Sequence, residues 1–210
     1  MIPLRPTPFP KVNRKALPAD TELRRVHSSA FDSKSFNPCL GRPSRFAPLR
    51  QPDSTCVPTA HAAQSFECAV HEVIFHDVPP GTHPRSVPLS AIEPLSYGII
   101  RSRRALTLAS LHEPDLNAFG LDRRDLIDTL PSEYGQTAKW PLAIHDAHPD
   151  IEGLIWTSRR CDPYVAYVLF GDRIAPGDFD VLRKAPITDT PDLLRQVREF
   201  GQRAGIFISI

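Results

Sequence analysis

Three polar residues stand where a purely structural chain would have little use for them. Arg45 lies in the turn-rich segment GRPSRF, Glu72 in the apolar stretch SFECAVHEVIFH, and Ser158 at the end of the apolar stretch GLIWTS. Because more than half of the chain separates the first from the last, a shared site must be built from tertiary contacts. An arginine, a half-buried carboxylate and a hydroxyl together suit binding a phosphate-bearing ligand and stabilising a cation on a sugar ring.

Each of these residues also has an ordinary structural interpretation. A half-buried carboxylate such as Glu72 commonly pairs with an arginine, whereas a carboxylate beside a ribose stabilises oxocarbenium charge as a glycosidic bond breaks. Arg25 and Arg45 likewise allow two interpretations: each could form an ion pair with an acidic side chain, or each could bind a pyrophosphate. Ser158 is either a strand-end hydroxyl bonded to backbone or, with Arg159, a functional group where a strand runs into a loop. The residue types alone leave both interpretations open.

Other common chemistries lack their motifs. The sequence has no GxGxxG or Walker loop and no GxSxG elbow, which disfavours a Rossmann fold, a P-loop and an activated-serine hydrolase. In HEVIFH, His71 and His76 are five residues apart, about 140° around a helix, and cannot share a metal as an i, i+4 pair does. His145 and His148 have ligand spacing but no third partner in view. We therefore expect no metal site.

Composition predicts a globular protein with a substantial core. The chain has 210 residues, 41% of them hydrophobic and 23% charged, and its net charge of +1 gives no reason to expect nucleic acid or an anionic membrane as the main partner. The cysteines have no CxxC spacing, so neither a zinc site nor a disulfide framework is indicated. No signal-peptide run and no stretch of about 18 apolar residues occurs, so we expect a cytoplasmic location.

Proline is unusually frequent. The 23 prolines are about twice the average usage, which predicts many turns and few long helices. Five of them fall within the first 18 residues. We expect residues 1–20 to form an extended, polyproline-like arm outside a single domain of residues 21–210. An arm of this kind is suited to wrapping a second copy of the chain.

The spacing of hydrophobic residues predicts the strands and helices that must position the polar residues. Runs that predict strands are residues 22–29, 56–64, 86–111 (as two strands), 151–158, 164–170 and 206–210. Residues 164–170 are apolar on both faces, as in a strand buried from both sides. We expect them to neighbour residues 151–158 across a five-residue loop, and the last run to pack into the same sheet. Residues 32–55 predict a long loop.

Helix signals complete the pattern. Ser65 is suited to cap a helix whose apolar stripe docks on a sheet, with Glu72 beside the stripe, neither core nor freely exposed. Two short helices are expected within 112–131. Another is expected from residue 133, either up to Pro141 or through it to about His145, and a last one begins with Thr190 and Pro191. The sum is a mixed α+β fold with segregated, mostly antiparallel strands.

Taken in order, these pieces resemble the RES-domain family, which is named for an arginine, a glutamate and a serine and supplies toxins of bacterial toxin–antitoxin pairs. The matching segments are RRVHSS around Arg25, GRPSRFAPL around Arg45, VPTAHAAQSFECAVHEVIFHDVPP around Glu72, YGQTAKW, and GLIWTSRRCDPYVAYVLFGDR around Ser158. They span residues 22–173. None is diagnostic alone, and the resemblance rests on their order and spacing.

The resemblance implies an ADP-ribosyltransferase-like α+β fold around an NAD cleft, with NAD as substrate and no permanently bound cofactor or metal. It implies cleavage of the nicotinamide–ribose bond by hydrolysis or phosphorolysis, which depletes cellular NAD. It also implies a helix-turn-helix, Xre-type antitoxin that covers or plugs the cleft. Transfer of ADP-ribose to a protein on the same site, and a catalytically inactive binding module, are the alternatives.

Carried over residue by residue, the resemblance assigns roles. Arg25 and Arg45 would hold the phosphates, Glu72 would stabilise the cationic ribose or orient the acceptor, and Ser158 would bond the nicotinamide-side ribose or the amide. Arg159, next to Ser158, joins the expected binding residues.

The chain departs from the family pattern at one position. His61 stands where the family often carries a tyrosine in a YAA-like strand. An imidazole can still stack on a ring or donate to phosphate, and Tyr134 or Trp156 could supply the stacking instead.

Overall fold

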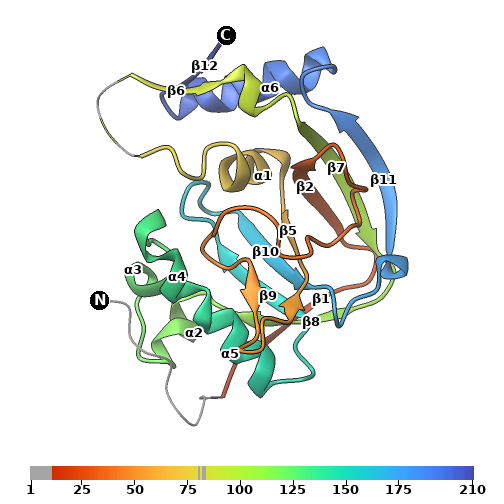
Figure 1. The fold of residues 1–210 in the computed structure, drawn as a ribbon, viewed down its shortest axis with the longest axis vertical. Helices are drawn as coiled ribbons and strands as arrows, with labels where there is room; N and C mark the ends of the chain where they lie inside the picture. The colour runs from red at the N-terminus through yellow and green to blue at the C-terminus, as the bar shows by residue number, and fades with distance from the viewer. Residues whose placement is uncertain (1–10, 80, 82–83) are drawn as a thin grey trace.

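A curled, mostly antiparallel sheet of eight strands organises the chain (Figure 1). The structure is a computed structural model that describes residues 11–79, 81 and 84–210. In sheet order the strands are β1 (Arg14–Leu17), β8 (Leu106–Ser110), β9 (Gly153–Thr157), β10 (Val165–Phe170), β5 (Thr59–Ala63), β2 (Glu22–Ser28), β7 (Leu95–Ser102) and β11 (Phe179–Pro186). β8 and β9 pair in parallel, and the other neighbours pair antiparallel. The predicted mixed α+β fold with mostly antiparallel strands is confirmed.

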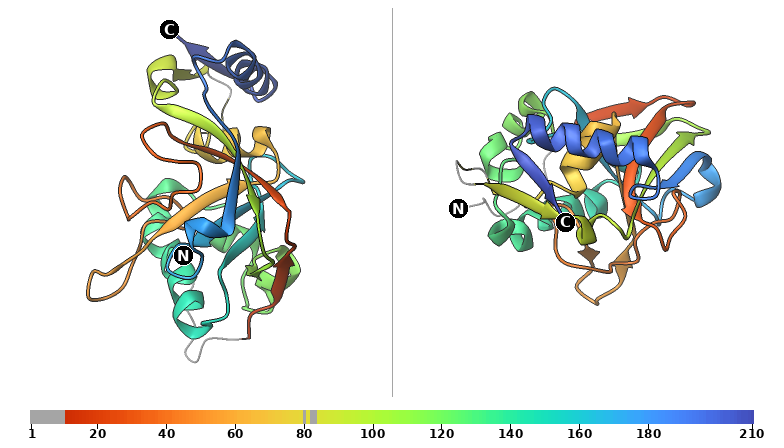
Figure 2. Two further views of the ribbon diagram at one scale, coloured as in Figure 1. Left: turned by 90° about the vertical axis from the view of Figure 1, so that its right-hand side faces the viewer. Right: turned by 90° about the horizontal axis from the view of Figure 1, so that it is seen from above.

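The helices flank this sheet. Their bounds are α1 (Phe66–Val73), α2 (Glu113–Asn117), α3 (Arg123–Leu126), α4 (Tyr134–Thr137), α5 (Lys139–Ala147) and α6 (Pro191–Arg203), with short 3-10 turns at Leu89–Ala91, Pro131–Glu133 and Pro176–Asp178. α2 to α5 gather on one side of the molecule, and α6 lies at one end (Figures 1 and 2). Where one helix was expected from residue 133, the chain forms two, and α5 continues through Pro141 because a proline in the first turn breaks no helical hydrogen bond.

Two apolar clusters hold the sheet from both faces. Val168 of β10 belongs to the cluster that includes helix residues such as Val70 and Ile144, whereas the adjacent Leu169 belongs to the other cluster. β10 is therefore buried from both sides, as its unbroken apolar run predicts. Leu17 of β1 and Phe179 of β11, on opposite edges, share the second cluster, so the sheet curls until both edges contribute to one core.

The segment before residue 20 differs from the expected arm. Residues 1–10 lie outside the described part of the chain, but β1 pairs with β8. Val12 is buried in the main core, and Arg14 forms an ion pair with Asp150 at 2.6 Å. The reason is that residues 11–17 contain no proline, so their backbone N–H groups are free to join a sheet edge.

The C-terminal strand was also placed wrongly. β12 (Ile206–Ser209) does not join the main sheet but pairs in parallel with β6 (Arg85–Pro88) as a separate two-stranded sheet beside α6 (Figures 1 and 2). Thr190 precedes α6 as predicted and Pro191 is its first residue, although the Thr190 side chain makes no capping hydrogen bond. Gly205, with φ of 67°, turns the chain back after α6, so β12 lies at that end.

The cysteine prediction was wrong in one respect. Cys39 and Cys56 form a disulfide with a Cα–Cα separation of 6.0 Å. Their separation of 17 residues matches no motif, and they meet because β3 (Leu49–Arg50) folds back on β4 (Cys56–Val57). The bridge closes the loop that carries Arg45. Within the described ranges, no helix is long and apolar enough to cross a membrane.

Candidate functional site

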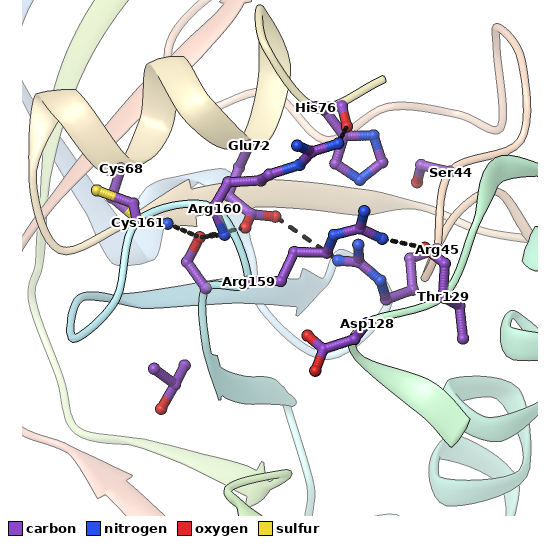
Figure 3. Close-up of polar contacts among 12 residues, drawn as sticks. Ser44, Arg45, Cys68, Glu72, His76, Asp128, Thr129, Arg159, Arg160 and Cys161 are labelled. Carbon is purple, nitrogen blue, oxygen red and sulfur yellow. Dashed lines mark hydrogen bonds and ion pairs between the residues drawn. The ribbon is translucent and has the colours of Figure 1, made fainter. Parts of the chain in front are cut away.

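Arg45, Glu72 and Ser158 converge, and Figure 3 shows Arg45 and Glu72 pointing toward one another. The Ser158 hydroxyl donates to Glu72 Oε1 at 2.6 Å, and Arg45 Nη1 lies 3.9 Å from Glu72 Oε2. Their side chains are almost fully buried, with 3% of Arg45 and 7% of Glu72 exposed. A loop, a helix and a strand end thus bring one cation, one anion and one hydroxyl together, across 86 residues between Glu72 and Ser158.

α1 directs Glu72 into this cluster. Ser65 accepts a hydrogen bond from the backbone N–H of Cys68, which confirms the predicted helix cap. Cys68 is fully buried, with its sulfur 3.6 Å from the Val165 carbonyl oxygen of β10. Residues four apart share a side of a helix, so anchoring Cys68 on β10 points Glu72 toward the same side.

Ser158 is held by its own loop. Its hydroxyl oxygen accepts the backbone N–H groups of Arg160 at 3.2 Å and Cys161 at 3.1 Å. A hydroxyl has two acceptor sites and one proton, so with both acceptor sites occupied the proton is directed at Glu72. The structural interpretation of Ser158 is confirmed, since its hydroxyl accepts from the turn that follows β9. The same hydroxyl contacts the Glu72 carboxylate, and a functional role for Ser158 stays a prediction.

Arg45 retains unused hydrogen-bond donors. Its Nε and Nη2 are buried without a hydrogen-bond partner among the residues that the structure describes. Burial lowers the pKa of this guanidinium, while the nearby Glu72 carboxylate opposes that shift. The rings of Phe46 and Tyr134 lie 5.9 and 6.0 Å from the guanidinium carbon, a distance at which aromatic rings attract a cation. Buried donors of this kind are suited to a ligand oxygen.

A cavity of about 460 Å³ adjoins Glu72. Its lining includes Glu72, Arg25, His61 and His76, together with the loop that follows β2. A second pocket of about 660 Å³ is lined by Ser158, Arg159, Arg160 and Arg123. The hydrogen-bonded pair of Glu72 and Ser158 thus has one member in each lining. Both volumes lie in the range of small-molecule sites, roughly 300–1,000 Å³.

Arg25 lies at the edge of the site, and its guanidinium donates hydrogen bonds to backbone carbonyls. Its Nε donates to the His61 carbonyl at 2.9 Å, and its Nη1 donates to the carbonyls of Ser35, at 3.0 Å, and Ser33. Burial lowers the pKa of the Arg25 guanidinium to about 10. These bonds tie β2 to β5 and to the loop that lines the cavity, and a phosphate-binding role for Arg25 stays a prediction.

The expected aromatic residues occupy different positions. His61 borders the cavity, and burial, reinforced by His76 and Arg25, lowers its pKa to about 4, so the ring is neutral near pH 7. Tyr134 is buried beside Arg45, and burial raises the pKa of its hydroxyl to about 12. Trp156 packs edge-on against Phe46 at 4.9 Å in the core and supports the loop of Arg45 rather than a ligand ring.

Arg159 lies beside Arg45 in Figure 3. It donates through Nη1 to the Thr129 carbonyl and borders the second pocket. Arg160 donates to the Val78 carbonyl at 2.7 Å, which ties the loop after β9 to the turn after α1. Together with Arg123, these two residues place three arginines in the lining of this pocket, which also includes the acidic residues Glu113, Asp128 and Asp162.

His76 was missed as a site residue. It lines the cavity with Glu72, its side chain is 11% exposed, and its Nδ1 lies 2.7 Å from Asp77 Oδ1. α1 ends at Val73 and His76 lies in the turn that follows, so no helical spacing in the sequence indicated that His76 would line the cavity with Glu72. His71 instead packs on Phe75, away from the site. Among the described residues, no group of three or more His, Cys, Asp or Glu is placed to hold a metal ion.

Fold and candidate site together define an α+β domain in which one buried arginine, one glutamate and one serine meet, the last two in the linings of two pockets. The RES domain family matches the chain over residues 22–191, which is most of its length. The chain therefore belongs to the RES-domain family, as the sequence predicted. No curated protein matches the chain. Membership in this family is consistent with an NAD-related function associated with toxin–antitoxin pairs.

Proposed function

We propose that this protein cleaves the nicotinamide–ribose bond of NAD on an ADP-ribosyltransferase-like fold, as the toxin of a bacterial type II toxin–antitoxin pair. The observation that carries the proposal is the Glu72 carboxylate, which is buried between Arg45 and Ser158, with Glu72 in the lining of one pocket and Ser158 in the lining of the other. Family membership supports the choice of NAD.

The chemistry needs a fixed negative charge. When nicotinamide departs with the electrons of its bond to ribose, positive charge develops on the sugar ring. Glu72 stabilises that charge, and it does so strongly because burial removes the screening by water. Mutagenesis of comparable preorganised groups gives about 3–4 kcal/mol. Nicotinamide leaves as a neutral molecule, so its departure requires no proton.

Arg45 and Ser158 have distinct tasks. The unpaired Nε and Nη2 of Arg45 would donate to a phosphate or ribose oxygen of the dinucleotide, assisted by Arg159 beside it. Ser158 holds the carboxylate in one orientation, since its only proton is directed at Oε1. The pocket that it borders would receive the nicotinamide side of the substrate.

The rim of the cavity supports an inhibitory partner. Phe31 and Leu40 line the cavity and yet are 46% and 57% exposed, and the neighbouring Val73 is 37% exposed. Exposed apolar side chains around a polar cavity are typical of a surface that another protein covers. A helix-turn-helix antitoxin that closes this mouth would block entry of NAD.

The test measures nicotinamide released from NAD by the purified chain, with and without inorganic phosphate, beside Glu72→Gln. The glutamine can still accept the Ser158 hydrogen bond but carries no charge, so we expect at least a 100-fold lower rate from a folded protein. Faster release with phosphate indicates phosphorolysis, and equal release indicates hydrolysis. Label from NAD on a protein instead would indicate ADP-ribosyl transfer. An E72Q rate equal to wild type would overturn the role of Glu72.

A further inference from the structure

The reaction proposed above requires a proton acceptor besides Glu72. When water attacks the ribose carbon, its oxygen forms the new bond and one proton must leave it. Glu72 is poorly placed to take that proton, because Oε1 already accepts from Ser158 and Oε2 faces the Arg45 guanidinium. Both oxygens are thus engaged by groups that stabilise negative charge, which suits the sugar cation and leaves neither oxygen free to receive the proton.

His76 has a ring nitrogen that is placed to accept the proton. It lines the same cavity, four residues further along the chain, and its Nδ1 is bound to Asp77 Oδ1 at 2.7 Å. A carboxylate on Nδ1 places the ring proton there and leaves Nε2 as a free lone pair. The Tyr134 hydroxyl is 3.4 Å from each ring nitrogen, which is long for an O–H···N bond and leaves Nε2 available to an acceptor molecule.

We propose that His76, oriented by Asp77, is the general base that deprotonates the acceptor in the cleavage of NAD. This inference rests on the function proposed above. The water oxygen bonds to the ribose carbon that nicotinamide leaves, and the water proton passes to His76 Nε2. Asp77, whose side chain is 68% exposed, then links the charged imidazole to solvent, where the proton is released. The products balance as nicotinamide, ADP-ribose and one proton.

The surroundings keep the ring neutral before the reaction. Burial lowers the pKa of His76 below its ordinary value, and the Arg45 guanidinium acts in the same direction, while Glu72 and Asp77 oppose both. The titratable and charged groups that face the ring from all sides are Arg45, His61, Glu72, Asp77, Tyr134 and Arg160. A neutral imidazole near pH 7 is the form that accepts a proton.

The test compares His76→Gln with wild type in water and with added azide. Hydrolysis should fall about 100-fold in kcat with little change in KM, because base catalysis contributes to the chemical step and not to binding. Azide carries no proton, so it should restore nicotinamide release by H76Q and form the glycosyl azide. Azide should not rescue E72Q, which lacks the charge that the sugar cation needs.

Asp77→Asn provides a second variant at an exposed side chain, where folding is not at risk. It should lower kcat about 10-fold or more, since the orienting carboxylate is lost. H76Q that is folded and hydrolyses NAD within twofold of wild type overturns this inference alone. A slow H76Q that azide does not rescue overturns it in favour of a positioning role. A wild-type protein that releases no nicotinamide overturns the proposed function and this inference with it.

Discussion

At the scale of single residues, the site depends on which atoms remain unpaired. Arg25 and Arg45 are both buried arginines close to a cavity. Arg25 donates hydrogen bonds to backbone carbonyls, whereas Nε and Nη2 of Arg45 have no hydrogen-bond partner among the described residues. A buried donor without a partner costs about 1–3 kcal/mol, so a ligand that satisfies it gains that amount. Arg45 is therefore the better candidate for contact with the dinucleotide.

Arg45→Lys tests this distinction. Lysine preserves the charge beside Glu72 but has neither the fork nor the unpaired Nε, so we expect KM for NAD to rise about tenfold, equivalent to about 1.4 kcal/mol. Steady-state kinetics of nicotinamide release would measure it. Arg183→Lys is a matched control, since Arg183 lies over the Tyr97 ring on β11 whereas Arg45 lies beside Glu72. An R45K variant with the wild-type KM would contradict the role of Arg45.

At the scale of elements, three different supports carry the three site residues. Ser65 and Cys68 orient α1 for Glu72, and the end of β9 holds Ser158. Arg45 has neither a helix nor a long strand beneath it. Its loop is held by the Cys39–Cys56 bridge and by Thr137, whose hydroxyl donates to the Arg45 carbonyl at 2.7 Å.

Replacing Cys39 and Cys56 with serine should lower the free energy of unfolding by about 3 kcal/mol, the value for a bridge closing a loop of about 15 residues. Activity should fall as well, because the loop carries Arg45. Urea unfolding with and without a thiol reductant would measure the stability loss. Cys68→Ser is the control, since Cys68 is a free thiol and its variant should respond to reductant as wild type does. Equal unfolding midpoints for the reduced and oxidised wild type would refute the structural role of the bridge.

At the scale of the whole molecule, several histidines fold in their neutral form. Burial lowers the pKa of each of His27, His61 and His71 from its ordinary value of 6.5 to about 4. The unfolded chain therefore binds more protons than the folded chain between about pH 6.5 and pH 4. The stability contributed by these neutral rings is complete above pH 6.5 and is lost as the pH falls through that window.

We accordingly expect the urea midpoint to decrease steadily from pH 7 to pH 4.5. His71→Gln would isolate one contribution, because His71 packs on Phe75 away from the cluster of Arg45, Glu72 and Ser158. The variant should show a shallower pH dependence than wild type, whatever its stability at pH 7. A wild-type midpoint that stays constant across this range would show that these rings are not buried as neutral groups.

The sequence by itself determined the elements whose signals are local. The cap at Ser65 and the apolar run of β10 depend on neighbours within a few residues, and both appear as predicted. The order and spacing of the segments around Arg25, Arg45, Glu72 and Ser158 also pointed to the family, which the match over residues 22–191 confirms. Such predictions succeed because helix capping and the period of hydrophobic residues depend only on residues within one or two helical turns or within one strand.

Only the tertiary structure decided which groups meet. The contact of Ser158 with Glu72 spans 86 residues. Arg25 donates to backbone carbonyls and Arg45 has unpaired donors, and this difference depends on where the folded backbone places its carbonyl groups. The Cys39–Cys56 bridge and the pairing of β12 with β6 likewise follow no local pattern. Their physical cause is the packing of distant segments, in which each contact depends on the curl of the whole sheet rather than on the residues beside it in the chain.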